Sequence, residues 1–440
     1  MKHLTLLALT VLLGFNAAIS QSWSWTEVDV DVDTRLADVY FSDMNNGWIV
    51  GSGGVVLNTK DAGSTWTSVE DIEGLDGNDL RGVFFLDSLT GWIIGAGSNN
   101  TPLIIKTVDA GATWEVQSFE GASERLANDI VFRNDSVGWV GLFNGKIFYS
   151  ENGGADWVEE DTRPSGGSNA RVSQINEISV SPNRAIAGGQ VSGSGTSKNY
   201  ALIDRQPGPP PFWFGDFSPE IPNADRIETV HLLNDSVGFA GGLEGNIYRL
   251  QGFTNENWSV VYEVPEDVAF LRSIDFADEM NGWALANTND ASMGTIHRTT
   301  NTGDSWMELP RVEGRMLKLN AVTDGSTYRV WVVGEEGRAY VGQPETSSIS
   351  NIISLQEISV YPNPVTDRFS VSLDLSQSDR YNIELYDVNG RLVRNLFNGT
   401  LPGGQSTLEF DNIDFASSGT YVLRLMDSDG GVRSVPLVVR

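Results

Sequence analysis

The chain has 440 residues, no cysteine, and a formal net charge of −29 at pH 7. This length exceeds what one hydrophobic core usually supports, so we expect about two domains. The acidity argues against a nucleic-acid partner, because binding to phosphates requires clustered Lys and Arg. The lack of cysteine excludes a disulfide framework and a cysteine nucleophile. Short β-branched and aromatic runs between Gly-rich turns predict an all-β chain.

Residues 1–20, MKHLTLLALTVLLGFNAAIS, combine a basic start, a short apolar run and small residues at the end. This order is typical of a secretory signal peptide. The apolar run is too short to span a bilayer, and no later stretch is long enough either. We therefore expect export without a transmembrane segment.

A Gly-Trp strand motif recurs along the chain. GWIVG at 47–51 matches GWIIG at 91–95, and related segments continue to VWVVG at 330–334. The seven copies begin at residues 47, 91, 138, 185, 238, 282 and 330. This spacing fits one four-stranded sheet per copy, which is the blade of a β-propeller.

The last copy lacks a fourth strand of its own. SWTEV at 24–28 resembles TWTSV at 65–69, the fourth strand of the first copy. Residues 21–342 are therefore predicted to form a seven-bladed β-propeller whose last blade is completed by the N-terminal strand 24–28. Such closure removes an exposed sheet edge.

A second motif lies between the third and fourth strands of four units. It reads TKDAGSTW at 59–66, TVDAGATW at 107–114, SENGGADW at 150–157 and TTNTGDSW at 299–306. It resembles the Asp-box of sialidase-type propellers, in which the Asp accepts backbone N–H groups and the Gly takes positive φ. Asn replaces Asp in two copies, which a turn tolerates and a catalytic acid would not. We therefore predict a structural role for Asp61, Gly63, Trp66, Asp109, Gly111, Trp114, Asn152, Gly154, Trp157, Asn301, Gly303 and Trp306.

The whole unit resembles the photosystem II stability/assembly factor-like propellers, also called BNR-repeat propellers, over about residues 22–342. Units 4 and 5 depart from the pattern because they lack the Asp-box, and unit 4 carries the insert RQPGPPPFWFGDF at 205–217. The resemblance implies a binding scaffold, not a reaction.

A more distant resemblance to Asp-box glycosidases, including sialidases, leaves an enzyme as an alternative. No spacing singles out a catalytic set, so we predict no catalytic residue, and the prediction leans against an enzyme without excluding one. No metal or other cofactor is expected. A purely structural or adhesive surface protein is the other alternative.

A basic residue stands before or at the first strand of most units. Together these residues are predicted to surround one mouth of the central channel and to bind an anionic glycan or a protein. They are Arg35, Arg81, Arg125, Arg226, Arg272 and Lys318. The competing interpretation is that each one only pairs with a nearby carboxylate. The aromatic segment PPPFWF at 209–214 is a second, weaker candidate for a partner-binding loop.

Residues 343–355 are expected to be a linker, and residues 356–440 a small Ig-like β-sandwich without the repeat. YPNP at 361–364, ELYDVNGRLV at 384–393, SGTYVLRL at 418–425 and the final VVR resemble the type A sorting domain of the type IX secretion system. Tyr361, Pro362, Asn363 and Pro364 would form its sorting motif. The resemblance implies recognition by the type IX secretion machinery, a Bacteroidota-type cell, and a secreted or cell-surface location.

Overall fold

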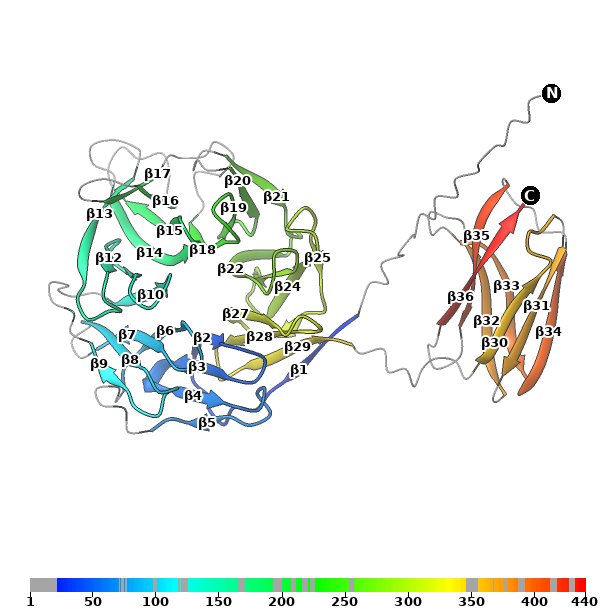
Figure 1. Cartoon of the computed structure of the whole chain (residues 1–440), viewed down its shortest axis with the longest axis horizontal. Coiled ribbons are helices and arrows are strands. Elements are labelled where there is room, and N and C mark those ends of the chain that lie inside the picture. The colour runs from blue at the N-terminus through cyan, green and yellow to red at the C-terminus, as the bar shows by residue number, and fades with distance from the viewer. Residues whose placement is uncertain are drawn as a thin grey trace, which may run out of the picture. The chain divides into compact units, whose positions relative to one another are not determined.

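The computed structural model describes residues 22–440 apart from short gaps, and it divides the chain into two compact units between Pro344 and Glu345 (Figure 1). The residues left out are 1–21, 71, 73–74, 76, 98–100, 118, 120–125, 165–170, 193–199, 207–210, 216–220, 222–225, 253–256, 346–354, 367, 376–377, 387–391, 412–417 and 427–431. The predicted signal peptide and most of the predicted linker lie outside the described residues.

The strands of the first unit are arranged in a ring around a central channel, in seven sets of four that we number as blades 1 to 7 (Figure 1). The inner strands are β2 (Leu36–Phe41), β6 (Leu80–Phe85), β10 (Ala127–Phe132), β14 (Arg171–Val180), β18 (Ile227–Leu232), β22 (Val268–Phe276) and β27 (Met316–Thr323). The second strands are β3 (Gly47–Gly51), β7 (Gly91–Ala96), β11 (Gly138–Leu142), β15 (Ala185–Ser192), β19 (Val237–Gly242), β23 (Gly282–Thr288) and β28 (Tyr328–Gly334).

Further strands complete each blade toward the outside of the ring. The third strands are β4 (Val56–Thr59), β8 (Pro102–Thr107), β12 (Ile147–Ser150), β16 (Tyr200–Gln206), β20 (Ile247–Gln251), β24 (Met293–Thr299) and β29 (Ala339–Pro344). The outer strands are β5 (Thr67–Ser68), β9 (Glu115–Val116), β13 (Val158–Pro164), β17 (Phe212–Gly215), β21 (Trp258–Tyr262), β25 (Met307–Glu308) and, in blade 7, β1 (Trp23–Glu27). A short strand β26 (Val312–Glu313) also pairs with β24, and a 3-10 turn η1 spans Ser52–Gly54.

Two pairings hold the ring together at its outer side. The N-terminal strand β1 runs antiparallel to β29, with Trp25 opposite Gly342, so the two ends of the propeller lie in one sheet. The outer strands β13 and β17 run parallel to each other and join blades 3 and 4 into one eight-stranded sheet.

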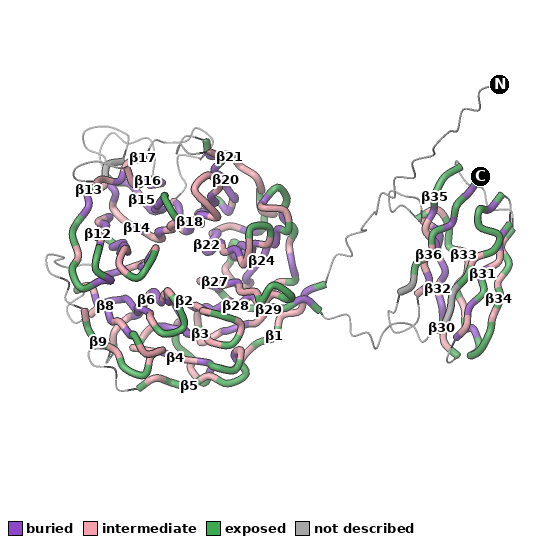
Figure 2. Tube along the Cα trace, in the orientation of Figure 1, coloured by how far each residue is buried: buried purple, intermediate pink, exposed green. Residues whose placement is uncertain are grey.

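The core of the propeller lies between successive blades, where the second strands are buried (Figure 2). The Gly-Trp motif explains this arrangement, because its tryptophans are large enough to fill the space between two sheets. Trp48, Trp92, Trp139, Trp283 and Trp331 are all at most 4% exposed. Trp48, for example, stacks on Phe85 of the next blade with ring centroids 5.1 Å apart.

The second unit consists of two antiparallel sheets with a shared apolar core. One sheet has the order β30 (Leu355–Tyr361), β31 (Arg368–Leu375) and β34 (Gly404–Asp411). The other has the order β33 (Leu392–Leu401), β32 (Asp379–Tyr386), β35 (Gly419–Met426) and β36 (Val432–Val439). The prediction of an all-β chain with a propeller and a smaller β unit is confirmed. None of the described residues forms a helix long and apolar enough to cross a membrane.

Candidate functional site

Every inner strand contains a register shift at the same place, and this shift builds one mouth of the channel. The pairing of β2 with β3 skips one residue between Leu36 and Asp38, and β6, β10, β18 and β27 each skip one residue in the same way. Strand β14 has two such shifts, and the shift in β22 spans the three residues between Ala269 and Ser273. Such a bulge re-aims the side chains at and after the extra residue. The mouth pocket, of about 250 Å³, is lined by one bulge residue from each blade: Ala37, Arg81, Asn128, Asn176, Glu228, Arg272 and Leu317.

Five of the six predicted basic residues line this mouth pocket. They occupy three different positions around the bulge, so their distances in sequence from the start of the inner strand differ from blade to blade. Arg81 and Arg272 are bulge residues, Arg35 and Arg226 lie two residues before the bulge, and Lys318 directly follows it. The sixth, Arg125, lies outside the described residues.

The arginines of the mouth form two pairs, each sharing one carboxylate. Asp79 lies 3.1 Å from Arg81 and 3.8 Å from Arg35. Arg35 also reaches Glu335 at 3.7 Å. On the other side of the ring, Glu228 contacts Arg226 and lies 3.1 Å from Arg272.

The mouth also places aromatic rings beside two of these arginines. The guanidinium carbon of Arg81 lies 5.9 Å from the ring centroid of Phe143, and that of Arg272 lies 5.7 Å from Phe270. The Nε atoms of Arg81 and Arg272 are buried and have no hydrogen-bond partner among the described residues. Asp38 and Asp129 line both the mouth pocket and the channel, and each accepts a backbone N–H group of the next blade.

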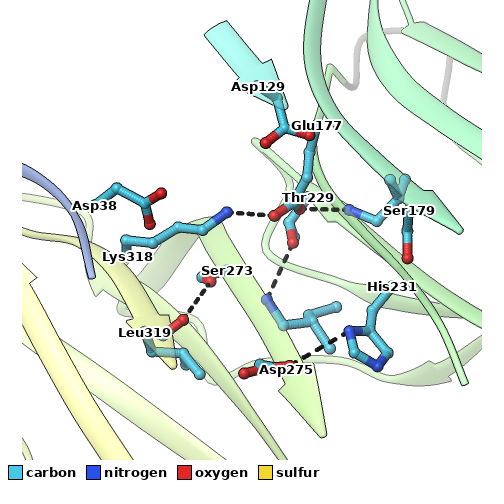
Figure 3. Close-up of polar contacts among 12 residues, drawn as sticks. Asp38, Asp129, Glu177, Ser179, Thr229, His231, Ser273, Asp275, Lys318 and Leu319 are labelled. Atoms are coloured by element: carbon cyan, nitrogen blue, oxygen red, sulfur yellow. Dashed lines mark hydrogen bonds and ion pairs between the residues drawn. The ribbon is translucent and has the colours of Figure 1, made fainter. Parts of the chain in front are cut away.

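The channel below the mouth is a cavity of about 210 Å³ with four carboxylates, Asp38, Asp129, Glu177 and Asp275, which we call the channel carboxylates (Figure 3). Lys318 of blade 7 pairs with Glu177 of blade 4, so this ion pair crosses the channel between opposite sides of the ring. The prediction grouped Lys318 with the arginines of the mouth, but its ammonium group pairs within the channel.

Burial controls the pKa values of the groups in the channel. It raises the pKa of Asp38 to about 6 and, together with the charge of Glu177, that of Asp129 to about 7. Burial also raises the pKa of Asp275 and lowers that of His231. For Lys318 burial acts downward, but the carboxylates around it outweigh this effect and raise its pKa. Both effects follow from the cost of charge in a buried site and from nearby opposite charge.

In blades 1, 3, 4 and 5 the side chain that follows the bulge accepts a backbone N–H group of the next blade. Asp38 accepts the Val83 backbone N–H at 2.9 Å, and Thr229 accepts that of Ile274 at 3.0 Å. The same contact joins Asp129 to Ile178 and Glu177 to Val230.

A second set of hydrogen bonds between blades lies two residues further along the inner strands. Asp275 accepts the Ala321 backbone N–H, and Asn320 accepts the Phe41 backbone N–H. The inner strand is an edge of its sheet, and these contacts satisfy backbone groups that no strand would otherwise pair. The sequence analysis missed this set, although a polar residue three positions before Phe41 and Phe132 was a visible signal.

The four Asp-box turns share one geometry, on the loops between third and outer strands. Asp61 accepts the Thr65 backbone N–H at 2.9 Å and the Thr65 hydroxyl at 2.7 Å. The Thr59 hydroxyl, in turn, accepts the Gly63 N–H at 2.9 Å. Equivalent contacts recur around Asp109, Asn152 and Asn301, with Asn152 and Asn301 each accepting the backbone N–H four residues later.

The glycine of each Asp-box packs against the preceding blade. An added Cβ would lie 2.0 Å from Trp331 at Gly63, 2.1 Å from Trp48 at Gly111 and 2.3 Å from Phe239 at Gly303. At Gly154 it would lie 3.3 Å from Trp92. The box therefore fixes a turn and seats it on an aromatic ring.

The aromatic insert and the sorting motif also have defined places. Trp213 is fully buried in β17 (Phe212–Gly215), so the FWF part of the PPPFWF segment belongs to a strand. In the second unit, Asn363 accepts the Val438 N–H at 2.8 Å and donates to the Pro436 carbonyl at 2.9 Å, which ties the YPNP segment to the last strand. Tyr361 is 79% exposed.

The described residues contain no group of three or more His, Cys, Asp and Glu side chains arranged to hold a metal ion. The channel carboxylates each accept a backbone N–H group of the next blade, so they form a structural network.

Comparisons with known proteins agree with this architecture. Residues 17–122 match the family described as photosynthesis system II assembly factor YCF48, and residues 359–439 match the secretion system C-terminal sorting domain. The chain joins a YCF48-like propeller to a type IX sorting domain. That domain marks the protein for export to the cell surface or the medium.

Among solved structures, YCF48 from Cyanidioschyzon merolae is 21% identical, with a TM-score of 0.55, and the match covers 73% of this chain and 99% of that one. A YCF48 structure bound to D1 peptide is 16% identical, with a TM-score of 0.55, and the match covers 74% of this chain and 97% of that one. The GH74 xyloglucanase from Xanthomonas campestris is 10% identical, with a TM-score of 0.57, and the match covers 94% of this chain and 81% of that one. These similarities establish the fold alone.

One curated relative, the ulvan lyase NLR42 of Nonlabens ulvanivorans, is 28% identical over 85 residues. The match covers 19% of this chain and 15% of that enzyme. The activity of the relative therefore cannot be transferred to this protein.

Proposed function

We propose that the exported propeller is a binding protein that holds an acidic segment of a partner peptide at the mouth pocket. The observation that carries this proposal is the convergence of Arg35, Arg81, Arg226 and Arg272 on one pocket, which Lys318 also lines while it pairs with Glu177. The four arginines come from four of the seven blades and concentrate positive charge on an otherwise acidic protein. Electrostatic complementarity of this kind selects anionic ligands.

The two arginine pairs favour an extended ligand over a small anion. Arg226 and Arg272 share Glu228, so this trio carries one positive charge in excess. The other pair lies on the opposite side of the ring, and a ligand lying across the mouth would contact both. The Nε–H groups of Arg81 and Arg272 donate to no acceptor among the described residues, so each guanidinium keeps an unused donor beside the mouth pocket. The YCF48 structure bound to a D1 peptide is a precedent for a peptide on this type of propeller.

The channel carboxylates argue for binding over hydrolysis. A glycosidase requires two carboxyl groups free to act on the substrate. Asp38, Asp129 and Glu177 instead accept backbone N–H groups of the next blade, and Glu177 also holds Lys318.

The test is fluorescence anisotropy of a labelled glutamate-rich peptide with the purified full chain. Arg81→Gln/Arg272→Gln should weaken binding about tenfold or more, since each charge-assisted hydrogen bond contributes about 1.5–3 kcal/mol. Lys60→Gln/Arg311→Gln removes the same charge away from the mouth and should leave binding nearly unchanged. Equal loss in both variants would show a non-specific charge effect. If a sulfated glycan bound more tightly than the peptide, the glycan and not the peptide would be the ligand of the mouth pocket.

A further inference from the structure

The join between blades 3 and 4 creates a cavity that is separate from the channel. Among the described strands, β13 and β17 are the pair through which two blades share one sheet. A cavity of about 470 Å³ opens beside this join and is lined by residues from β12, β13 and β16, by Glu151, Asn152 and Asp156 of the turn between β12 and β13, and by Pro211. None of its lining residues belongs to the mouth pocket.

One wall of this cavity is a fixed polar network around Glu160, a carboxylate that is only 6% exposed. Glu160 accepts hydrogen bonds from Trp213 at 2.8 Å, from Trp139 at 3.3 Å and from Arg205 at 2.6 Å. The Arg205 guanidinium is thereby held 4.7 Å from the ring centroid of Tyr149. The wall is therefore rigid, and its aromatic ring already carries a cation on one side.

The rest of the lining combines apolar surface with negative charge. Val158 is 65% exposed although it lies in a strand, and Tyr149 and Pro211 also line the cavity. The lining carries five carboxylates and one arginine, a formal balance of 1 − 5 = −4. The carboxylates are Glu151, Asp156, Glu159, Glu160 and Asp161.

These two properties define the ligand. An apolar surface beside carboxylates suits a side chain with an aliphatic stem and a cationic end. Glu160 pairs with Arg205, and Glu159 pairs with Lys146. Glu151 accepts the Tyr149 hydroxyl at 3.0 Å and Asp156 accepts the Asn152 amide at 2.8 Å, so both carboxylates keep their negative charge to face such an end. A pocket of this size that joins apolar walls to a few polar groups is typical of a binding site.

We propose that this cavity, which we call the acidic side pocket, binds a lysine or arginine side chain of a partner peptide. The stem lies along Tyr149 and Val158, and the charged end pairs with Glu151 and Asp156. The acidic side pocket is separate from the mouth pocket and prefers ligands of the opposite charge. The two sites therefore hold different segments of one partner or two different partners.

The test compares two labelled peptides that differ at one position, lysine in one and norleucine in the other. Norleucine keeps the aliphatic stem and removes the charge. Fluorescence anisotropy with the full chain should show binding of the lysine peptide and about tenfold weaker binding of the norleucine peptide. Raising the salt concentration should weaken binding of the lysine peptide only.

A double substitution locates the site. Glu151→Gln/Asp156→Asn should weaken binding of the lysine peptide about two- to thirtyfold, because each of the two partly exposed ion pairs contributes about 0.2–1 kcal/mol. The matched control Glu70→Gln/Glu115→Gln removes two exposed carboxylates from blades 1 and 2 and should have little effect. Tyr149→Leu should also weaken binding, by removing the ring.

Three results would overturn the proposal. One is no binding of the lysine peptide to the wild-type chain at millimolar concentration. Another is equal binding of the lysine and norleucine peptides. The third is an equal effect of the two double substitutions, which would mean that net charge and not the acidic side pocket attracts the peptide. Loss of acidic-peptide binding in the mouth variant leaves this site unaffected, so the two proposals fail separately.

Discussion

The packing of the Asp-box glycine gives the most direct test of how the blades are held together. Gly63 has a φ of 75°, a conformation that L-residues rarely adopt. A Cβ added at this glycine would lie 2.0 Å from the Trp331 indole of blade 7, far inside van der Waals contact. Gly63→Ala therefore combines backbone strain with a steric clash between two blades.

A matched glycine separates the two effects. Gly53 has a φ of 78°, and a Cβ added there meets nothing within 4 Å. Gly53→Ala should cost about 1–2 kcal/mol for the left-handed backbone alone. Gly63→Ala adds about 1–3 kcal/mol of overpacking, so its unfolding free energy should fall by about 2–5 kcal/mol.

Tryptophan fluorescence during urea unfolding is the suitable assay. All 13 tryptophans lie between residues 23 and 331, so their signal reports the propeller and not the second unit. Gly63→Ala should unfold at a lower urea concentration than Gly53→Ala. Equal midpoints for the two variants would refute the reasoning, because they would mean that the indole moves away at no cost.

Other predictions concern the channel and the ring closure. The folded-state pKa of Asp129 is about 7, against an ordinary 3.8, so the folded chain binds more protons between these values. The contribution of Asp129 to stability is therefore present below pH 4 and is lost as the pH rises through 7. Between pH 5 and 7.5 the unfolding free energy of Asp129→Asn, measured by urea titrations, should fall less than that of the wild-type chain. Lys318→Met should cost about 3–5 kcal/mol at pH 8, and less at pH 5 where Asp38 and Asp129 bind protons; an equal cost at both pH values would contradict this. Deleting Trp23–Glu27 opens the edge of β29 and should lower the melting temperature and cause association in size-exclusion chromatography. A monomer of unchanged melting temperature would show that β1 is dispensable.

Local sequence patterns were sufficient to predict the repeating elements. The Gly-Trp motif, the Asp-box and the alternating strands after residue 356 each describe contacts within a few residues or within one recurring unit. A turn such as Thr59–Thr65 needs only its own side chains and backbone, so its geometry could be read from the residue types. The sorting domain was recognisable for the same reason, since its motif is short and contiguous.

The position of the basic residues around one mouth was also predictable, because each stands near the start of an inner strand. Their separation into two arginine pairs and one cross-channel lysine was not. It depends on the bulge in each inner strand, and a bulge is an irregularity of pairing that the sequence of one strand does not reveal. Asp79 and Glu228 became partners of two arginines each only because neighbouring blades bring these side chains together.

The contacts that join distant parts of the chain were decided by the tertiary structure. Lys318 and Glu177 are 141 positions apart and meet because the ring places blades 4 and 7 on opposite sides of the channel. The acidic side pocket exists because β13 pairs with β17, two outer strands whose sequences carry no signal for each other. The sequence by itself determined the blades, their turns and the export domain, since these rest on local propensity and repetition. Ring closure decided which charged side chains meet, because burial and opposing charge act only between groups that the fold has brought together.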